Sequence, residues 1–363
     1  MGILHAGACR EDLIGIEVDK GSLVEFNKSI GPIESEARKL AKPSRCKICG
    51  TPTTDLCRSH TIPKYCLKEI AQDGELLSFA ALLGGNLRKK VVGISGVMVF
   101  KMICKRCDTE YFKLYETPET LFESPTNQVM AQIAVKCLLN RIYHANCIIQ
   151  ENKLLGESAP MTIRARATSK EYDKEEYERA YRSAVAAGRK DAGAGFKLIF
   201  HRVVPYVAPF AFQQMIALES DFDGGLINNL HCYSRNYRTD WLYVCVLPSK
   251  GCTVVTVFRR ADANRYRDFE AQLAKLTDAE ALLAIIKIIF AYSEDVYLSK
   301  AVKDRVACSE ELKALAAMEN KYSGFGESYA AYRKAVEKAS MQDFAIKNLP
   351  KPPALLSREY AVG

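Results

Sequence analysis

The pattern of hydrophobic and polar positions is clearest in the second half of the chain. Trp241–Leu247 and Cys252–Phe258 are rich in Val, Tyr, Cys and Phe, and Pro248-Ser-Lys-Gly251 separates them. Two β-rich runs joined by a four-residue segment with Pro and Gly predict a β-hairpin. Helical spacing of apolar residues follows, and Thr277 before an acidic first turn is typical of a helix N-cap. The predicted helices are Asn264–Lys275, Asp278–Ser293, Ser309–Tyr322 and Ser328–Ser340.

The first half of the chain alternates helical patterns with one β-rich segment. Val91–Ile103 is the β-rich segment, and it leads directly into a pair of cysteines. Ser169–Ala187 is rich in Glu, Lys, Arg and Tyr, which favours an exposed or bridging helix. Helices are further predicted over Ser35–Ala41, Ile62–Ala71, Glu110–Leu121 and Asn127–Tyr143.

Length and composition bound the class of protein. The 363 residues suggest two or three domains, and 48% hydrophobic residues are sufficient for buried cores. The longest apolar run, Ala281–Phe290, is too short for a membrane span and contains Lys287. The first residues lack the pattern of a secretory signal, so the 13 cysteines are expected to be reduced and the protein cytoplasmic.

Positive charge is concentrated in one fifth of the chain. Between Lys42 and Glu116 there are 13 Lys or Arg and 7 Asp or Glu, a balance of +6 out of a total of +8. Such a surface suits phosphate groups, because Lys and Arg displace counterions from a polyanion, although a solvated basic face without a partner fits equally well. The candidate contacts to DNA or RNA are Arg58, Lys64, Arg88, Lys89, Lys90, Lys105 and Arg106.

Two Cys-x-x-Cys pairs, Cys46/Cys49 and Cys104/Cys107, carry the most specific chemistry in the chain. Each spacing lets two sulfurs converge from one tight turn, and four thiolates satisfy a tetrahedral Zn²⁺ ion. We therefore expect a structural zinc site, the alternative being two unrelated pairs of reduced thiols. The two pairs are far apart in the chain, so the long segment between them must begin and end near the metal ion.

Between the two pairs lies Ser59-His60-Thr-Ile-Pro63. The order Cys-x-x-Cys, Ser-His-x-x-Pro, Cys-x-x-Cys resembles the zinc-stapled branch of the HNH nucleases, which share a treble-clef, ββα-metal core. It is also similar to uncharacterised bacterial proteins with Ser-His-Ile-Ile-Pro, a Cys-x-x-Cys-Glu knuckle and a Tyr-Glu pair. Asp108 and Tyr115-Glu116 correspond to the last two features, and the resemblance covers roughly residues 44 to 120.

The resemblance implies a metal-dependent endonuclease that hydrolyses phosphodiesters, in the setting of a bacterial defence or toxin-like effector. His60 would be the general base that activates water. Asp108, Glu110 and Glu116 would supply ligands for a catalytic Mg²⁺ or Mn²⁺. Acidic residues that open a helix also complement its dipole, which is the simpler reading of these three.

The chain departs from the family at two positions. Ser59 occupies a place where Asp or His is preferred as a metal ligand, and Val97–Ile103 contains no Asn to orient the base. His60 then has a structural or zinc-linked role as its alternative. The alternative function is a non-catalytic zinc-binding module that binds nucleic acid or a protein partner.

The expected fold class is α+β, with a zinc-stapled treble-clef unit followed by an α+β unit built on the hairpin and its helices. The second unit lacks a dense polar constellation, which favours recognition of a protein partner over chemistry. Leu349 onward, with three prolines, is expected to be loosely ordered. The predicted divisions are an extension (1–40), an HNH-like zinc domain (41–152), a polar helix and linker (153–195), a C-terminal domain (196–345) and a tail (346–363).

Overall fold

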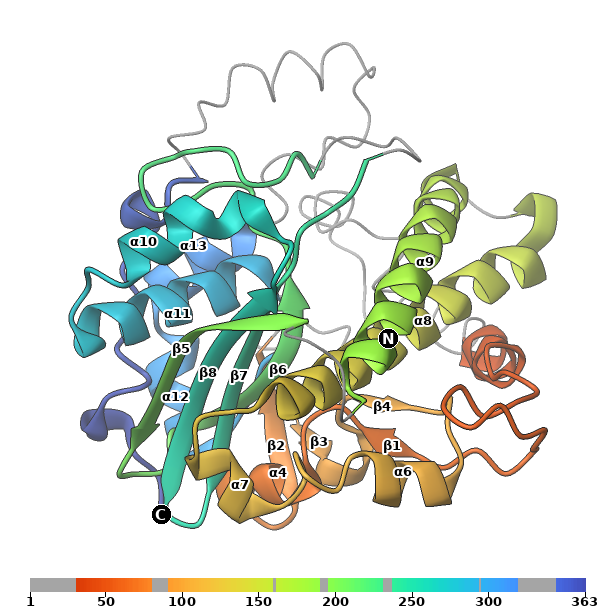
Figure 1. Ribbon diagram of the computed structural model, residues 1–363, viewed down its shortest axis with the longest axis horizontal. Coiled ribbons are helices and arrows are strands. Elements are labelled where there is room, and N and C mark those ends of the chain that lie inside the picture. Colours follow the sequence, from red (N-terminus) through yellow and green to blue (C-terminus); the bar gives the residue numbers. More distant parts are fainter. Residues whose placement is uncertain are drawn as a thin grey trace, which may run out of the picture. The chain divides into compact units, whose positions relative to one another are not determined.

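The computed structural model describes residues 31–79, 91–158, 161–189, 195–230, 237–293, 295–318 and 344–363 (Figure 1). The chain forms two compact units. The first unit comprises the chain up to Thr61, Met98–Glu116 and Gln132–Ala186, and the second comprises Ile62–Val97, Thr117–Ala131 and Ala187–Gly363. Both helices and strands are present, so the predicted mixed α+β class is confirmed.

The second unit is organised around a seven-stranded antiparallel sheet with the order β3-β2-β9-β6-β7-β8-β5. Neighbours in this sheet come from distant parts of the chain, since β9 lies between β2 and β6. The strands are β2 (Glu75–Ser78), β3 (Val91–Gly93), β5 (Phe196–Val204), β6 (Phe210–Ile216), β7 (Leu242–Ser249), β8 (Cys252–Arg260) and β9 (Tyr297–Leu298).

The β7–β8 hairpin is confirmed, but its turn is shorter than predicted. Ser249 pairs with Cys252, which leaves only Lys250 and Gly251 in the loop. Both residues have positive φ, 49° and 76°, as a type I′ turn requires at its two central positions. Pro248 lies within the strand, opposite Thr253.

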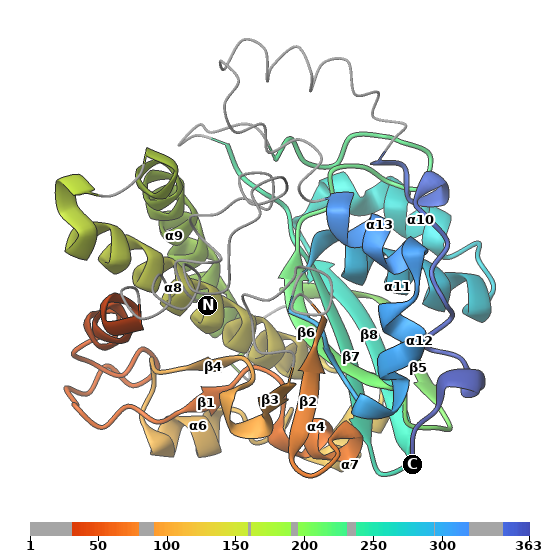
Figure 2. The ribbon, with the colours of Figure 1, turned by 180° about the vertical axis from the view of Figure 1, so that it is seen from behind.

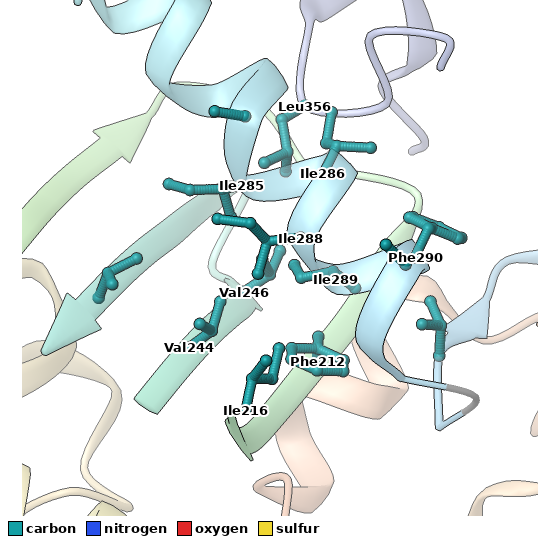
Figure 3. Packing of buried hydrophobic residues seen from close by; sticks show 14 of the residues in the cluster. Phe212, Ile216, Val244, Val246, Ile285, Ile286, Ile288, Ile289, Phe290 and Leu356 are labelled. Atoms are coloured by element: carbon teal, nitrogen blue, oxygen red, sulfur yellow. The ribbon is translucent and has the colours of Figure 1, made fainter. Parts of the chain in front are cut away.

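Helices cover the sheet of the second unit, and one face packs against a cluster of apolar helical residues. The helices are α4 (Lys64–Ile70), α7 (Pro118–Phe122), α10 (Arg267–Leu273), α11 (Asp278–Tyr292), α12 (Lys303–Ala307) and α13 (Glu310–Met318). Figure 2 shows α10, α11 and α13 gathered on one side of the strands. In Figure 3, Ile285 and Ile288 of α11 lie over Val244 and Val246 of β7. On the opposite face α4 packs against β6 and β7, so β7 is buried along its whole length.

Local sequence signals account for the start of α11. The Thr277 side chain accepts a hydrogen bond from the backbone N–H of Glu280, and the Glu280 carboxylate accepts one from the backbone N–H of Thr277. This reciprocal capping box satisfies two N–H groups that a helix start otherwise leaves without partners. The predicted cap at Thr277 is therefore confirmed.

The C-terminal tail is ordered, contrary to the prediction from its prolines. Leu355 and Leu356 are at most 2% exposed and belong to the core of the second unit. The Tyr206 hydroxyl donates to the carbonyl of Leu356 (2.7 Å), and the backbone N–H of Val362 donates to the carbonyl of Val207 (3.0 Å). Burial of leucines compensates for the lack of regular hydrogen bonding around the prolines.

The first unit contains the cysteine pairs and two long helices. Residues 31–40 form a helix, which agrees with the brief helix expected there. The other elements are β1 (Ser59–His60), β4 (Val99–Phe100), α6 (Lys105–Tyr111), α8 (Asn127–Leu155) and α9 (Met161–Ala187), of which α8 begins with five residues that belong to the second unit.

The predicted helix Glu110–Leu121 is wrong, because α6 ends at Tyr111 and α7 begins only at Pro118. Pro118 explains the break: the residue before a proline is driven out of helical geometry, and Thr117 is extended. The predicted β-rich segment Val91–Ile103 contains two short strands, β3 and β4, joined by a 3₁₀ turn over Ile94–Gly96. The predicted helix Ser328–Ser340 lies outside the described residues.

The compact units do not follow the predicted divisions of the chain. Ile62–Val97, assigned to the zinc domain, contributes two strands and α4 to the second unit. The polar helix α9, predicted within a separate division of polar helix and linker, is part of the first unit. Divisions drawn along the sequence differ from the compact units because sheet pairing and helix packing join segments that are far apart in the chain. Among the described helices, none combines the length and the apolar character that a membrane span requires.

We predict that Leu356→Ala lowers the free energy of unfolding of the second unit by about 2–5 kcal/mol, because it leaves a cavity in the core. Lys351→Ala, at an exposed position of the same tail, is the matched control and should change stability by less than about 0.5 kcal/mol. Chemical denaturation of the full chain measures both. Equal, small effects would show that the tail does not contribute to this core.

Candidate metal centre and the neighbouring lysine site

Four cysteine side chains converge in the first unit. The sulfur atoms of Cys46, Cys49, Cys104 and Cys107 all lie within 4.8 Å of one another. Cys46 and Cys107 are buried, whereas Cys49 is exposed. Within the described residues, this is the one group of three or more His, Cys, Asp or Glu side chains that could hold a metal ion. The predicted ligand set is thus brought together.

Each cysteine pair is shaped by local backbone hydrogen bonds. In the first turn, Gly50 donates to the carbonyl of Cys46 (2.8 Å), and its φ of 70° is a conformation that suits glycine. In the second, Cys104 occupies the N-cap of α6, so that Cys107 lies in the first turn of the helix. The backbone N–H of Cys104 points at the Cys46 sulfur (3.4 Å), which links the two turns directly.

Helix α9 holds the first turn in place from outside. The Tyr181 hydroxyl donates to the backbone carbonyl of Lys47 (2.5 Å), and the Lys47 ammonium pairs with Glu178 (2.5 Å). Lys47 lies between the two cysteines of its pair. Burial raises the pKa of Tyr181, which keeps the hydroxyl protonated to a higher pH than that of an exposed tyrosine. The polar helix predicted from sequence therefore supports the turn that carries the first cysteine pair.

The Ser-His element forms strand β1, which pairs with β4 just before the second cysteine pair. Ser59 lies opposite Phe100 and His60 opposite Val99. Ser59 is completely buried, and its hydroxyl donates to Asp108 Oδ1 (2.6 Å). His60 is half-buried.

A buried lysine from α8 occupies the centre of this region. Only 1% of the Lys136 side chain is exposed, and its Nζ lies 3.1 Å from Asp108 Oδ1 and 2.5 Å from Glu116 Oε1. Nζ also contacts Ser59 Oγ (3.1 Å) and the carbonyl oxygen of His60 (3.2 Å). The Phe112 ring lies 4.5 Å from Nζ, and its face adds a cation–π contact. A buried ammonium requires such partners, because desolvation without them is costly.

Aromatic and amide groups fix the residues around Lys136. The Tyr115 hydroxyl donates to the carbonyl of Thr61 (2.7 Å), and Gln132 of α8 accepts from the backbone N–H of Tyr115 (3.0 Å). Burial raises the pKa of Glu116, and the charge of Lys136 acts in the opposite direction. Burial, and then the charge of Asp108, raises the pKa of the Cys57 thiol to about 12. Cys57 is therefore a half-buried neutral thiol beside Asp108.

This geometry does not support the predicted site for Mg²⁺ or Mn²⁺. Asp108 and Glu116 do converge, but on the ammonium of Lys136, and Glu110 is exposed elsewhere on α6. The three carboxylates do not form a group that could hold Mg²⁺ or Mn²⁺. Sequence reasoning missed Lys136, although a lysine on the buried face of a helix was visible in the pattern.

Only some of the basic residues predicted to contact nucleic acid lie in the same compact unit. Arg58, Lys105 and Arg106 are exposed in the first unit, whereas Lys64 belongs to the second unit. Arg88, Lys89 and Lys90 lie outside the described residues.

A different basic group is evident beside β1 and β4. The pairing of Ser59 with Phe100 sets Arg58 across from Lys101. Partial burial, followed by the positive charges of Lys42 and Arg58, lowers the pKa of Lys101. We call Lys42, Arg58 and Lys101 the basic triad.

The structure describes two further histidines, His144 and His201. His144 is half-buried, and desolvation holds its pKa well below the usual range. His201 Nδ1 lies 3.0 Å from the Thr256 hydroxyl on the neighbouring strand. The Asp221-Phe-Asp223-Gly-Gly225 segment is a turn in which Asp221 Oδ1 accepts hydrogen bonds from the backbone N–H groups of Asp223 and Gly225. His231 lies outside the described residues.

No protein-family model, no curated protein and no solved structure matches this chain.

We predict that Lys136→Met destabilises the first unit by about 2–3 kcal/mol, because it leaves two carboxylates without their shared counter-charge. The value lies below that of a fully buried pair, since Asp108 and Glu116 are 26% and 33% exposed. Lys153→Met, at an exposed position of the same helix, should be neutral.

The loss should depend on pH. Glu116 already has a raised pKa, and removal of Lys136 raises it further, so the folded state of the variant binds a proton that the unfolded state releases. Stability of Lys136→Met then falls as pH rises from the ordinary Glu value towards the raised one. The gap from the wild-type protein should be wider at pH 8 than at pH 5, and a gap independent of pH would contradict the assignment.

Proposed function

We propose that the first unit is a zinc-stapled module, similar to a treble clef, that binds nucleic acid without hydrolysing it. The four sulfurs supply the donor set of a structural Zn²⁺ site, which is closed by four protein ligands and leaves no position for substrate. The Cys-x-x-Cys turn on one side and the helix that starts at Cys104 on the other support the treble-clef comparison.

The observation that carries the non-catalytic assignment is the position of Lys136. HNH-type hydrolysis, which the sequence resembles, needs a divalent cation beside the base to stabilise the leaving oxygen. In this chain Asp108 and Glu116 are neutralised by an ammonium instead. The Ser59 hydroxyl donates a hydrogen bond to Asp108, which fits a structural hydrogen-bond network. A lysine cannot exchange for a hydrated metal ion, so the binding-module alternative is favoured over the nuclease.

The basic triad supports nucleic acid as the ligand. The positive charges of Lys42 and Arg58 contribute to the lowered pKa of Lys101, and a phosphate group beside them would favour the charged form of this lysine. Arg58 precedes β1 and Lys101 follows β4, so the pairing of these strands brings the two residues to the same end of the ladder. Lys105 and Arg106, exposed in the first turns of α6, extend the positive surface. Recognition of a protein partner by the second unit stays a prediction.

The purified protein should contain one zinc ion per chain. Cys49→Ser and Cys107→Ser should lose it and unfold the first unit, because metal binding in such sites supplies folding free energy. Cys308→Ser, at an exposed cysteine of the second unit, is the control and should retain zinc. Elemental analysis together with circular dichroism measures both effects. Full folding of Cys107→Ser without metal would contradict a structural zinc site.

Replacing Lys42, Arg58 and Lys101 by Ala should weaken binding of single-stranded and duplex oligonucleotides and flatten its salt dependence. Each lost phosphate contact should reduce the slope of log K against log salt by about 0.7 for single strands and about 0.9 for duplexes. Lys153→Ala and Arg182→Ala remove exposed charges elsewhere in the first unit and should leave the slope unchanged. Fluorescence anisotropy at several salt concentrations measures these slopes.

The same oligonucleotides decide between binding and hydrolysis. Incubation with Mg²⁺ or Mn²⁺ should yield no cleavage, and His60→Ala should bind as the wild-type protein does. Metal-dependent cleavage that His60→Ala abolishes, with zinc content intact, would establish the nuclease instead.

A further inference from the structure

The oxygens around Lys136 form a cage built from separate parts of the first unit. Ser59 Oγ and the His60 carbonyl come from β1, Asp108 Oδ1 from α6, and Glu116 Oε1 from the segment after α6. All four lie 2.5–3.2 Å from a single point, the Lys136 nitrogen. We call these four oxygens the oxygen cage.

The cage has the chemistry of a site for a hard cation. Carboxylate, carbonyl and hydroxyl oxygens are the ligands that Ca²⁺ and Mg²⁺ take in proteins, whereas the four thiols nearby suit softer ions. Its two carboxylates carry a charge of −2, of which Lys136 neutralises one unit. The cage therefore has the charge to balance a divalent ion, and the protein's own ammonium occupies its centre.

The dimensions of the cage favour a larger ion. Ca²⁺ binds oxygen at about 2.3–2.6 Å and tolerates irregular geometry, whereas Mg²⁺ requires about 2.0–2.1 Å and a nearly regular octahedron. The Glu116 oxygen, 2.5 Å from the centre, already lies at a Ca²⁺ distance, and the other three, at 3.1–3.2 Å, need to move by about 0.5–0.9 Å. Collapse onto Mg²⁺ would require about 1 Å at most positions, against β1 and α6, which fix Ser59 and Asp108.

We infer that the oxygen cage is a cation site whose resident cation is Lys136, and that removal of this ammonium uncovers a site for Ca²⁺. Truncation to Ala also frees the volume of the lysine stem. Water molecules there would complete the six to eight ligands that Ca²⁺ takes. The inference does not depend on whether the first unit binds nucleic acid.

The test uses the full-length, zinc-loaded chain and CaCl₂ as the probe. Lys136→Ala should bind one Ca²⁺ by isothermal titration calorimetry. At a Ca²⁺ concentration one hundred times the dissociation constant, its Tm should rise by about 5–10 °C. EGTA should reverse the shift, and MgCl₂ should give a smaller one. Wild-type protein and Lys153→Ala should not respond, because in both the ammonium remains in the cage.

A second substitution separates the oxygen cage from adventitious binding. Lys136→Ala combined with Glu116→Gln removes one cage carboxylate and should lose the Ca²⁺ response, with zinc content unchanged. If Lys136→Ala is unfolded alone, Ca²⁺ should restore its circular dichroism spectrum, and the test is repeated with Lys136→Gln, which retains a polar side chain. Failure of both variants to bind Ca²⁺, or an equal response from the double variant, would overturn the inference.

Discussion

The first unit depends on the convergence of four thiols that the chain brings from two distant turns. Cys46 and Cys49 precede Cys104 and Cys107 by more than fifty residues, and most of the intervening chain belongs to the second unit. Closing a loop of that length costs conformational entropy that a few backbone hydrogen bonds do not offset. A shared metal ion would supply that free energy, and it would fix the short ladder of β1 and β4, which contains Ser59 and His60 and is flanked by Arg58 and Lys101.

The buried ammonium of Lys136 has a comparable role beside the metal centre. It joins β1, α6, the segment at Glu116 and helix α8 through contacts with four oxygens. Such a site is strongly destabilised when one partner is lost, yet it specifies a unique arrangement when all are present. This arrangement connects the resemblance to HNH nucleases with the proposal of a non-catalytic module. Positions that the resemblance would assign to a bound metal ion contact the ammonium of Lys136 instead.

The second unit is stabilised mainly by the burial of apolar side chains. Its sheet is buried on both faces at β7, and the helices that cover it contribute isoleucine, leucine and phenylalanine side chains to one continuous core. The C-terminal segment completes that core with Leu355 and Leu356. The interpretation of this unit as a scaffold or a recognition surface stays a prediction.

The sequence by itself determined the features that depend on near neighbours. Thr277 and Glu280 define a helix start, Lys250 and Gly251 lie in the hairpin turn, and each Cys-x-x-Cys pair forms one tight turn. In these cases the interacting groups lie within a few residues of each other, so local pattern suffices. The identity of the four thiols could also be predicted, because the pair spacing is specific to a metal site.

Only the tertiary structure decided which distant segments meet. The two-residue strand β9 is too short to be recognised alone, yet it joins β2 to β6. Asp108 and Glu116 looked like metal ligands until α8 placed Lys136 between them. The reason is physical: the free energy of a buried charge depends on what surrounds it in space, and those neighbours come from parts of the chain that no local pattern relates.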